Sequence, residues 1–377
     1  MKVAIPRERA RHERRVALVP DTATKLLAAG LEVTIEAGAG SFAHITDEAY
    51  AQAGVKVVDG AQALLKEANA VLKVQAPEPA EIRLFIKGAV LISFLQPATQ
   101  ADTVKALAKH GITAFSLELV PRISRAQSMD ALSSQASASG YKAVLMAANK
   151  LGKFFPMMMT AAGTIAPARV LVMGAGVAGL QAIATARRLG AVVSAYDVRP
   201  AVKEEVQSLG AVFIELALEA QVGEGGYARE QSEEFLRKQR ELIGEHVAKS
   251  DVVITTAAVP GRRAPLLVTA EMVKGMRPGS VIVDLAAESG GNVEVTKAGE
   301  DADVGGVTIM GTLNVASTMP LHASQLYARN VANLLLHLVK DGAINLDFSD
   351  EITKGSCVTH GGEIVNERAK RLVAAAS

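Results

Sequence analysis

Several residue types are scarce in this sequence, and each scarcity excludes a class of protein. The 377 residues include one cysteine, Cys357, so no disulfide can form within the chain. Tryptophan is absent and aromatic residues make up 4% of the chain, which leaves few platforms for stacking nucleic-acid bases. The 40 basic and 39 acidic residues give a net charge of +1, so no overall field attracts a nucleic acid or an anionic membrane. A nucleic-acid-binding function is therefore disfavoured.

Signals for secretion, membrane insertion and metal binding are also missing. No basic segment followed by an apolar run and a cleavage site is found, which together with the single cysteine predicts a cytoplasmic location. The charge-poor stretch Phe154 to Ala186 is interrupted by prolines and glycines, so we expect a strand, a turn and a helix there instead of a bilayer span. Cys357 and His360 lack a second pair of ligands, and no metal site is expected.

The order of apolar segments predicts an α/β protein of two domains. Short apolar strands alternate with segments of helical spacing in both halves, and long helices are expected over Ser133 to Lys153 and Leu321 to Lys340. We therefore expect two Rossmann-like, doubly wound parallel-sheet domains, joined by long helices, with a cleft between them. The N-terminal domain is predicted over residues 1–130 plus 330–377, completed by the C-terminal tail, and the dinucleotide-binding domain over residues 135–325.

A glycine-rich motif typical of dinucleotide-binding proteins begins the second domain. The segment VLVMGAGVAG, residues 170–179, places G-x-G-x-x-G directly after an apolar strand and at the start of a helical pattern. Gly174 is expected to make the tight turn, Gly176 to admit a pyrophosphate, and Gly179 to allow close helix packing. A turn that binds nothing could contain these glycines, but the strand and helix around them favour a dinucleotide site that also includes Ala175 and Val177.

An acidic residue at the end of the next strand indicates which dinucleotide is bound. Asp197 follows Gly179 by about 20 residues, where a carboxylate meets the adenine ribose hydroxyls and repels a 2′-phosphate. This favours NAD(H). Arg199 keeps NADP(H) open, because an arginine beside the acid can accept that phosphate. The other residues expected at the site follow Asp197 or neighbouring strands: Val198, Thr255, Thr256, Ala257 and Leu285.

The segment between the predicted domains points to a family. Residues 121–135, PRISRAQSMDALSSQ, gather arginine, glutamine, aspartate and serine in one loop. Together with residues 155–164, FPMMMTAAGT, and with Gly225, Gly226 and Tyr227, this loop resembles the NAD(H)-binding component of proton-translocating NAD(P) transhydrogenase, which is domain I, the first segment of the alpha subunit. The resemblance covers essentially the whole chain, and that family is related to alanine dehydrogenase.

The resemblance implies that hydride passes between NADH on this chain and NADP⁺ on a partner domain, coupled to proton translocation by a membrane partner. Both partner domains would be on other chains, and the protein would be a homodimer, peripheral on the cytoplasmic side of the inner membrane. Gln127 would lie beside the nicotinamide ribose, Ser133 near the carboxamide, and Arg122 would pair with Asp130. Tyr227 would belong to a mobile loop that covers the adenosine.

The chemistry of the reaction separates this interpretation from its alternatives. An amino-acid dehydrogenase moves a proton as well as a hydride, and it therefore needs a positioned acid or base. Where alanine dehydrogenases carry a histidine and an aspartate, this sequence has Gln96 and Glu288. Arg15 and Lys73 resemble that enzyme's keto-acid ligands, so a soluble alanine-dehydrogenase-like enzyme is one alternative. A non-enzymatic NAD-sensing module is another, although it gives no reason for the residues 122–133.

The methionine run Met157 to Met159 has a less specific interpretation. Unbranched, polarizable side chains fill irregular gaps in apolar cores. We therefore expect these methionines to pack in the core or at the domain junction, without contacting a ligand.

Overall fold

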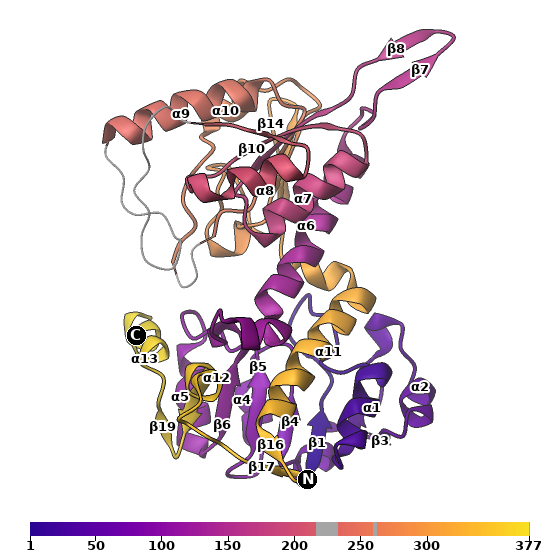
Figure 1. Cartoon of the computed structure of the whole chain (residues 1–377), viewed down its shortest axis with the longest axis vertical. Coiled ribbons are helices and arrows are strands. Elements are labelled where there is room, and N and C mark those ends of the chain that lie inside the picture. The colour runs from indigo at the N-terminus through magenta and orange to yellow at the C-terminus, as the bar shows by residue number, and fades with distance from the viewer. Residues whose placement is uncertain (216–232, 259–261, 377) are drawn as a thin grey trace. The chain divides into compact units, whose positions relative to one another are not determined.

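The chain forms two compact units, each built on one sheet (Figure 1). The computed structural model describes residues 1–215, 233–258 and 262–376. The first unit consists of Met1–Gln135 and Ala316–Ser377, and the second of Ala136–Val315. The chain passes from the first unit to the second within the long helix α6 (Ala131–Lys150), and a second long helix, α11 (Pro320–His337), follows its return to the first unit.

The first unit contains an eight-stranded sheet in the order β19-β18-β6-β5-β4-β1-β2-β3. Strands β1 to β6 run parallel in the 3-2-1-4-5-6 order of doubly wound folds, and the C-terminal hairpin β18–β19 extends the sheet antiparallel beyond β6. The strands are β1 (Lys2–Ile5), β2 (Glu32–Glu36), β3 (Lys56–Val58), β4 (Ala70–Leu72), β5 (Val90–Ser93), β6 (Thr113–Ser116), β18 (Cys357–His360) and β19 (Glu363–Ile364). In addition to α11, the helices of this unit are α1 (Pro20–Ala28), α2 (Asp47–Gln52), α3 (Ala61–Leu65), α4 (Pro79–Ile82), α5 (Ala101–His110), α12 (Glu351–Ser356) and α13 (Glu367–Ala375).

The second unit has a seven-stranded sheet, β11-β10-β9-β12-β13-β15-β14, whose first five strands repeat the 3-2-1-4-5 order and in which β15 follows β13 and β14 forms the edge. Its strands are β9 (Arg169–Met173), β10 (Val192–Tyr196), β11 (Val212–Phe213), β12 (Val252–Thr255), β13 (Val281–Asp284), β14 (Asp301–Val304) and β15 (Val307–Gly311). All are parallel except the edge strand β14. The helices described in this unit besides α6 are α7 (Val177–Arg188), α8 (Lys203–Ser208), α9 (Glu233–Ala248) and α10 (Ala270–Lys274). The predicted doubly wound α/β class is confirmed in both units.

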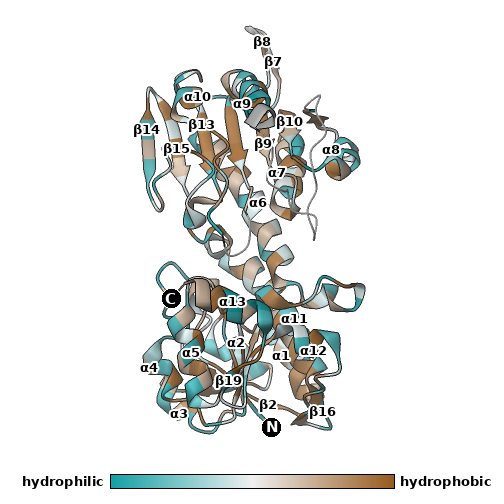
Figure 2. Cartoon of the chain, turned by 90° about the vertical axis from the view of Figure 1, so that its left-hand side faces the viewer, coloured by the Kyte–Doolittle hydropathy of each residue, from teal (hydrophilic) through white to brown (hydrophobic). Residues whose placement is uncertain are grey.

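Continuous apolar strands explain why each sheet is covered by helices on both faces. Strands β5, β12 and β13 are buried at every position, as expected when helices pack on both sides of a parallel sheet. Strands β9 and β13 of the second sheet accordingly appear brown, that is hydrophobic, in Figure 2, whereas the edge strand β14 is partly teal. In the first unit, α11 contributes Tyr327, Val331, Leu334 and Leu335 to the core, all fully buried. In the described part of the chain, no helix has both the length and the apolar character needed to cross a bilayer.

A two-stranded hairpin, β7 (Met158–Thr160) and β8 (Gly163–Ile165), stands away from the sheet of the second unit (Figure 1). Met157 is 56% exposed and Met159 74% exposed. The prediction of core packing is therefore wrong for Met157 and Met159, and packing at the domain junction stays a prediction. The physical reason is that only two strands form this sheet, so the side chains of Met159 and Ile165 are left exposed.

A candidate dinucleotide-binding site

The glycine-rich motif forms the turn between β9 and α7, and packing explains two of its three glycines. Gly174 has a φ of +100°, and a Cβ there would lie 2.5 Å from Thr256 Oγ1. A Cβ on Gly179 would lie 1.8 Å from the carbonyl oxygen of Gly174, a distance that excludes any side chain. A Cβ on Gly176 would meet nothing within 4 Å. The open space at Gly176 is the place where a ligand can approach the backbone.

The N-terminus of α7 opens onto that space. Gly176 is the N-cap residue, and no side chain from the described residues caps the helix. The first N–H groups of a helix have no partner within it, and the helix dipole adds partial positive charge at the same end. An anion such as a pyrophosphate satisfies both features. The residues here therefore fit a dinucleotide.

Sheet register brings three loops to one edge of the second sheet, beside this turn. Met173 is the register partner of both Tyr196 and Thr255, so β9, β10 and β12 end at the same level. The residues that follow these strands include Asp197 and Thr256. This edge lies at the reversal of strand order, where open α/β sheets bind their ligands.

Asp197 is locked to the glycine turn. Its carboxylate accepts a hydrogen bond from the backbone N of Ala175 at 2.7 Å, and from the backbone N, Nε and Nη2 of Arg199, each at 2.9 Å. Burial raises the pKa of Asp197, but the hydrogen bonds from Arg199 and Ala175 outweigh burial, and the net shift is downward. The group is therefore a carboxylate at neutral pH, and the guanidinium that could accept a 2′-phosphate is already paired with it.

Residues after β12 hold the turn from the other side. Thr256 donates its hydroxyl to the carbonyl of Gly174 at 3.0 Å, and the backbone of Ala257 is held by Asn292 through bonds of 3.1 and 2.8 Å. Thr256 was predicted to belong to the dinucleotide site, and its hydroxyl supports the glycine turn. The structure describes the other predicted residues as well. Val177 begins α7, and Val198 packs against the core of the second unit. The backbone N–H of Leu285 donates to the carbonyl of Thr255.

Two structural residues of this site were missed in the sequence analysis. Asp284, at the end of β13, is fully buried and accepts bonds from Thr255 Oγ1 at 2.9 Å, from Asn292 N at 2.9 Å and from Thr296 Oγ1 at 2.7 Å. An acidic residue at the end of an otherwise apolar strand was the available signal. Gly140 is the second: a Cβ there would lie 2.0 Å from the carbonyl oxygen of Ala178 in α7.

The residues predicted to be catalytic lie in the first unit. The expected loop is a 3₁₀ helix, η3 (Ser124–Met129), followed directly by α6. Arg122 and Gln127 are exposed, and Asp130 accepts bonds from the backbone N of Ser133 at 2.9 Å and its Oγ at 2.6 Å. Asp130 and Ser133 are thus brought together at the start of α6. The pairing of Arg122 with Asp130 stays a prediction, and Tyr227 lies outside the described residues.

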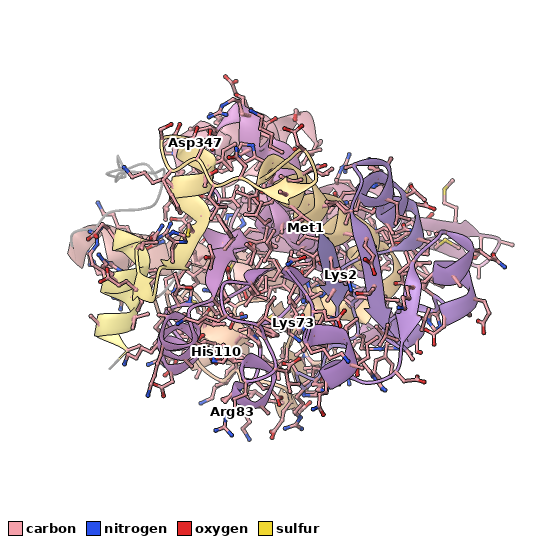
Figure 3. The ribbon with its side chains drawn as sticks, turned by 90° about the horizontal axis from the view of Figure 1, so that it is seen from below. Met1, Lys2, Lys73, Arg83, His110 and Asp347 are labelled. Carbon is pink, nitrogen blue, oxygen red and sulfur yellow. The ribbon has the colours of Figure 1, made fainter. Side chains whose placement is uncertain are left out.

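The basic residues that resemble keto-acid ligands are engaged by carboxylates. Arg15 donates Nε and Nη2 to Glu13 at 2.8 and 2.6 Å. Lys73 lies inside the first unit (Figure 3), with Nζ 3.0 Å from Glu81 and 3.4 Å from Glu8. Burial lowers the pKa of Lys73, but the two carboxylates outweigh burial and raise it. Both cations are therefore already paired with carboxylates inside the first unit.

Gln96 and Glu288 stand where the resemblance to alanine dehydrogenases leads one to expect a histidine and an aspartate. Gln96 is exposed, has a φ of +46°, and donates Nε2 to Gln75 at 3.3 Å. Its amide has no titratable proton, so it cannot act as a general acid or base. Glu288 lies in the second unit and accepts a bond from the backbone N of Asn314. Within the described residues, no three His, Cys, Asp or Glu side chains are grouped to hold a metal.

The fold and the glycine turn together define a two-domain dinucleotide-binding protein of the dehydrogenase type. Family models agree with this class. The model of the alanine dehydrogenase/PNT N-terminal domain matches residues 4–139, and that of the C-terminal domain matches residues 143–367. The chain belongs to the alanine dehydrogenase/PNT family.

Relatives from both branches of the family are similar along the whole chain. The first segment of the NAD(P) transhydrogenase alpha subunit of Rhodospirillum rubrum is 50% identical over 376 residues, which cover 97% of this chain and 98% of the relative. The crystal structure of transhydrogenase from Sinorhizobium meliloti is 47% identical, with a TM-score of 0.86 and coverage of 98% and 100%. A structure of L-alanine dehydrogenase has a TM-score of 0.85 at 27% identity, covering both chains fully.

Proposed function

We propose that this chain is the NAD(H)-binding hydride-transfer component of a proton-translocating NAD(P) transhydrogenase. It would pass hydride between NADH and NADP⁺ bound on a partner domain. The observation that carries the proposal is Gln96, because an amide at this position cannot itself supply or accept the proton that an amino-acid dehydrogenase must move. The identities of 50% and 47% with two transhydrogenases, against 27% with an alanine dehydrogenase structure, support the same choice.

The division of labour among the residues follows from what hydride transfer needs. NAD(H) supplies the hydride, and transfer between two nicotinamides moves no proton on a heteroatom. The protein must hold the reacting carbons at about 3–3.5 Å with their rings aligned. The N-terminus of α7 would hold the pyrophosphate, and Asp197 the adenine ribose. Gln127 and Ser133 would orient the nicotinamide end, and Arg122 with Asp130 would fix that loop.

The proposal assigns the remaining components to other chains. An NADP(H)-binding domain and a proton-translocating membrane domain would be supplied by partner subunits, and this chain would act as a homodimer. It would then lie on the cytoplasmic face of the inner membrane, attached through the complex. NAD(H) would be held by the domain of residues 135–325, and residues 1–130 with 330–377 would form the other domain.

Arg15 and Lys73 favour a second candidate, an alanine-dehydrogenase-like activity on a keto acid. Single-turnover absorbance distinguishes the two. NADH-loaded protein is mixed separately with an NADP⁺-loaded partner domain and with pyruvate plus ammonia. Oxidation with the partner domain only is the expected result. Oxidation with pyruvate and ammonia would overturn the proposal, and no oxidation in either mixture would favour an NAD-sensing module.

A further inference from the structure

One face of α11 carries polar residues that bind the η3 turn. Asn330, Asn333 and His337 are spaced i, i+3 and i+7, so they lie on the same side of the helix. The amide groups of Asn330 and Asn333 both donate to the carbonyl oxygen of Ser128, at 2.9 and 3.1 Å. Two donors therefore hold one carbonyl of η3, in the residue directly after Gln127.

The third polar residue of this face reaches η3 through an aspartate. His337 Nε2 lies 2.9 Å from Asp350 Oδ2, and Asp350 Oδ1 accepts Nη2 of Arg125 at 3.0 Å. Asp350 also caps α12, since it accepts the backbone N–H groups of Ile352 and Thr353, each at 2.9 Å. One carboxylate thus joins α11, α12 and η3.

These contacts lie on both sides of Gln127 in the sequence. Arg125 is held by Asp350, Ser128 by the two asparagines, and the side chains of Ala126 and Met129 are buried in the core of the first unit. Gln127 itself is exposed. Short 3₁₀ helices have poor hydrogen-bond geometry and little stability of their own. The orientation of Gln127 therefore depends on these external contacts.

We propose that Asn333, Asp350 and Arg125 are positioning residues for hydride transfer, because they fix the η3 turn that presents Gln127. This inference rests on the proposed function. None of these three residues is among those predicted to contact the dinucleotide, and the glycine turn and Asp197, which would hold its pyrophosphate and adenine ribose, belong to the second unit. Loss of the positioning residues should therefore slow hydride transfer while the affinity for NADH stays unchanged. A misplacement of about 1 Å can cost up to roughly 100-fold in rate.

The variants remove the contacts with η3 and are chosen so that the first unit still folds. Asn333→Ala leaves Asn330 on the Ser128 carbonyl, and Asp350→Asn keeps a good helix cap while removing the charge that binds Arg125. Arg125→Gln removes the other partner of that pair, and Arg125→Lys is the conservative variant that should restore part of the effect. Thr46→Ala is the control, because the Thr46 hydroxyl caps α2, another helix of the same unit.

Two readouts separate this inference from the proposed function. Hydrogen exchange of the Ala126 and Asp130 amides, which bond within this turn, reports on η3 without any turnover. The single-turnover rate of the full chain with an NADP⁺-loaded partner domain reports on catalysis. We expect faster exchange and a transfer rate about tenfold lower in the three charge-removing or truncating variants, with unchanged NADH affinity and wild-type behaviour in Thr46→Ala.

Other outcomes are equally informative. Unchanged exchange at η3 would overturn the structural half of the inference, whatever the protein catalyses. Faster exchange with an unchanged transfer rate would overturn the claim that η3 positions Gln127 for the reaction. A wild-type chain that transfers no hydride to the partner domain would contradict the proposed function, and exchange alone would then decide whether α11 holds the turn.

Discussion

Single residues connect the loops at the carboxyl ends of both sheets in the same way. In the second unit, the backbone N of Ala175 donates to Asp197 at 2.7 Å, and Arg199 pairs with that carboxylate. In the first unit, the backbone N of Arg7 donates to Glu36 at 2.8 Å, and Arg9 pairs with Glu36 at 2.7 Å. Each carboxylate follows or ends the second strand. Gly176, the glycine that leaves room for a pyrophosphate, belongs to the turn of the second unit.

Removing the charge of Asp197 should change the choice of dinucleotide. In Asp197→Ser, the guanidinium of Arg199 loses its carboxylate and becomes available to a 2′-phosphate. We expect about tenfold weaker NADH binding and tighter NADPH binding, measured by fluorescence titration. The double variant Asp197→Ser with Arg199→Met should lose the increase in NADPH affinity. An NADPH affinity that does not rise in the single variant would show that Arg199 is not the determinant.

The Asp350 cluster should make stability depend on acid pH. Partial burial raises the pKa of Asp350, but hydrogen bonds from Thr353, His337 and Arg125 outweigh it and hold the pKa below its ordinary value of 3.8. A depressed acid contributes stability above its unfolded pKa and loses it as the pH falls through the folded pKa. The contribution should therefore be complete above about pH 4 and decline below it.

Urea unfolding at pH 6 and pH 3 tests this expectation. Asp350→Asn should be less stable than wild type at pH 6, and it should lose less stability between the two pH values. Asp102→Asn is the control, since the Asp102 side chain is fully exposed and lies 3.9 Å from the Lys105 ammonium. Parallel pH dependences in wild type and Asp350→Asn would refute the argument.

At the scale of elements, strands buried on both faces were predictable, and elements held only by tertiary contacts were not. The apolar runs of β12 and β13 could be recognised as strands, because three apolar residues follow one another in each and every position is buried. Edge strand β14, with the sequence DADV, lacks such a run and forms by pairing with β15. Likewise, the glycine motif located the candidate site, whereas the bond between Asp284 and Thr255 joins strands 29 residues apart in sequence.

Two glycines provide a matched test of the α7 N-terminus. In Gly140→Ala the new methyl group would collide with the Ala178 carbonyl at 2.0 Å, so α6 and α7 must separate. We expect a loss of about 1–3 kcal/mol in unfolding free energy, together with weaker NADH binding. In Gly176→Ala the methyl group meets no protein atom within 4 Å, so the unfolding free energy should stay near that of wild type. The same methyl group fills the space left for the pyrophosphate, so NADH binding should weaken.

Chemical denaturation and NADH titration of both variants check this pair. If Gly176→Ala bound NADH as well as wild type, the pyrophosphate would not lie over this glycine. If Gly140→Ala were as stable as wild type, the close contact between α6 and α7 would have no energetic importance.

At the scale of the whole molecule, the hairpin β7–β8 exposes apolar side chains that nothing in a single copy of the chain covers in the described residues. An isolated two-stranded hairpin is marginally stable in water. Exposed apolar side chains on such an element favour a contact with another protein surface. We expect Met159→Asp to shift the proposed homodimer toward monomer, as measured by light scattering after size-exclusion chromatography.

A second exposed apolar residue serves as the comparison for that experiment. Val212 is 62% exposed on the edge strand β11, so Val212→Asp adds the same charge elsewhere in the second unit. Val212→Asp should leave the molar mass of the dimer, measured by light scattering, unchanged. Dimers of equal stability in Met159→Asp and wild type would exclude the hairpin as an essential part of the interface.

The split composition of the first unit determines the sequence of events during synthesis. Its core includes α11, and its sheet is completed by β18 beside β6, yet these elements are made only after the entire second unit. Until α11 and β18 are made, one edge of β6 has no partner strand in the nascent chain. The apolar core residues that pack with Tyr327 also stay exposed. The inserted unit, being continuous in sequence, is free to fold first. Ribosome-bound intermediates of this protein should therefore have a finished second half and an unfinished beginning.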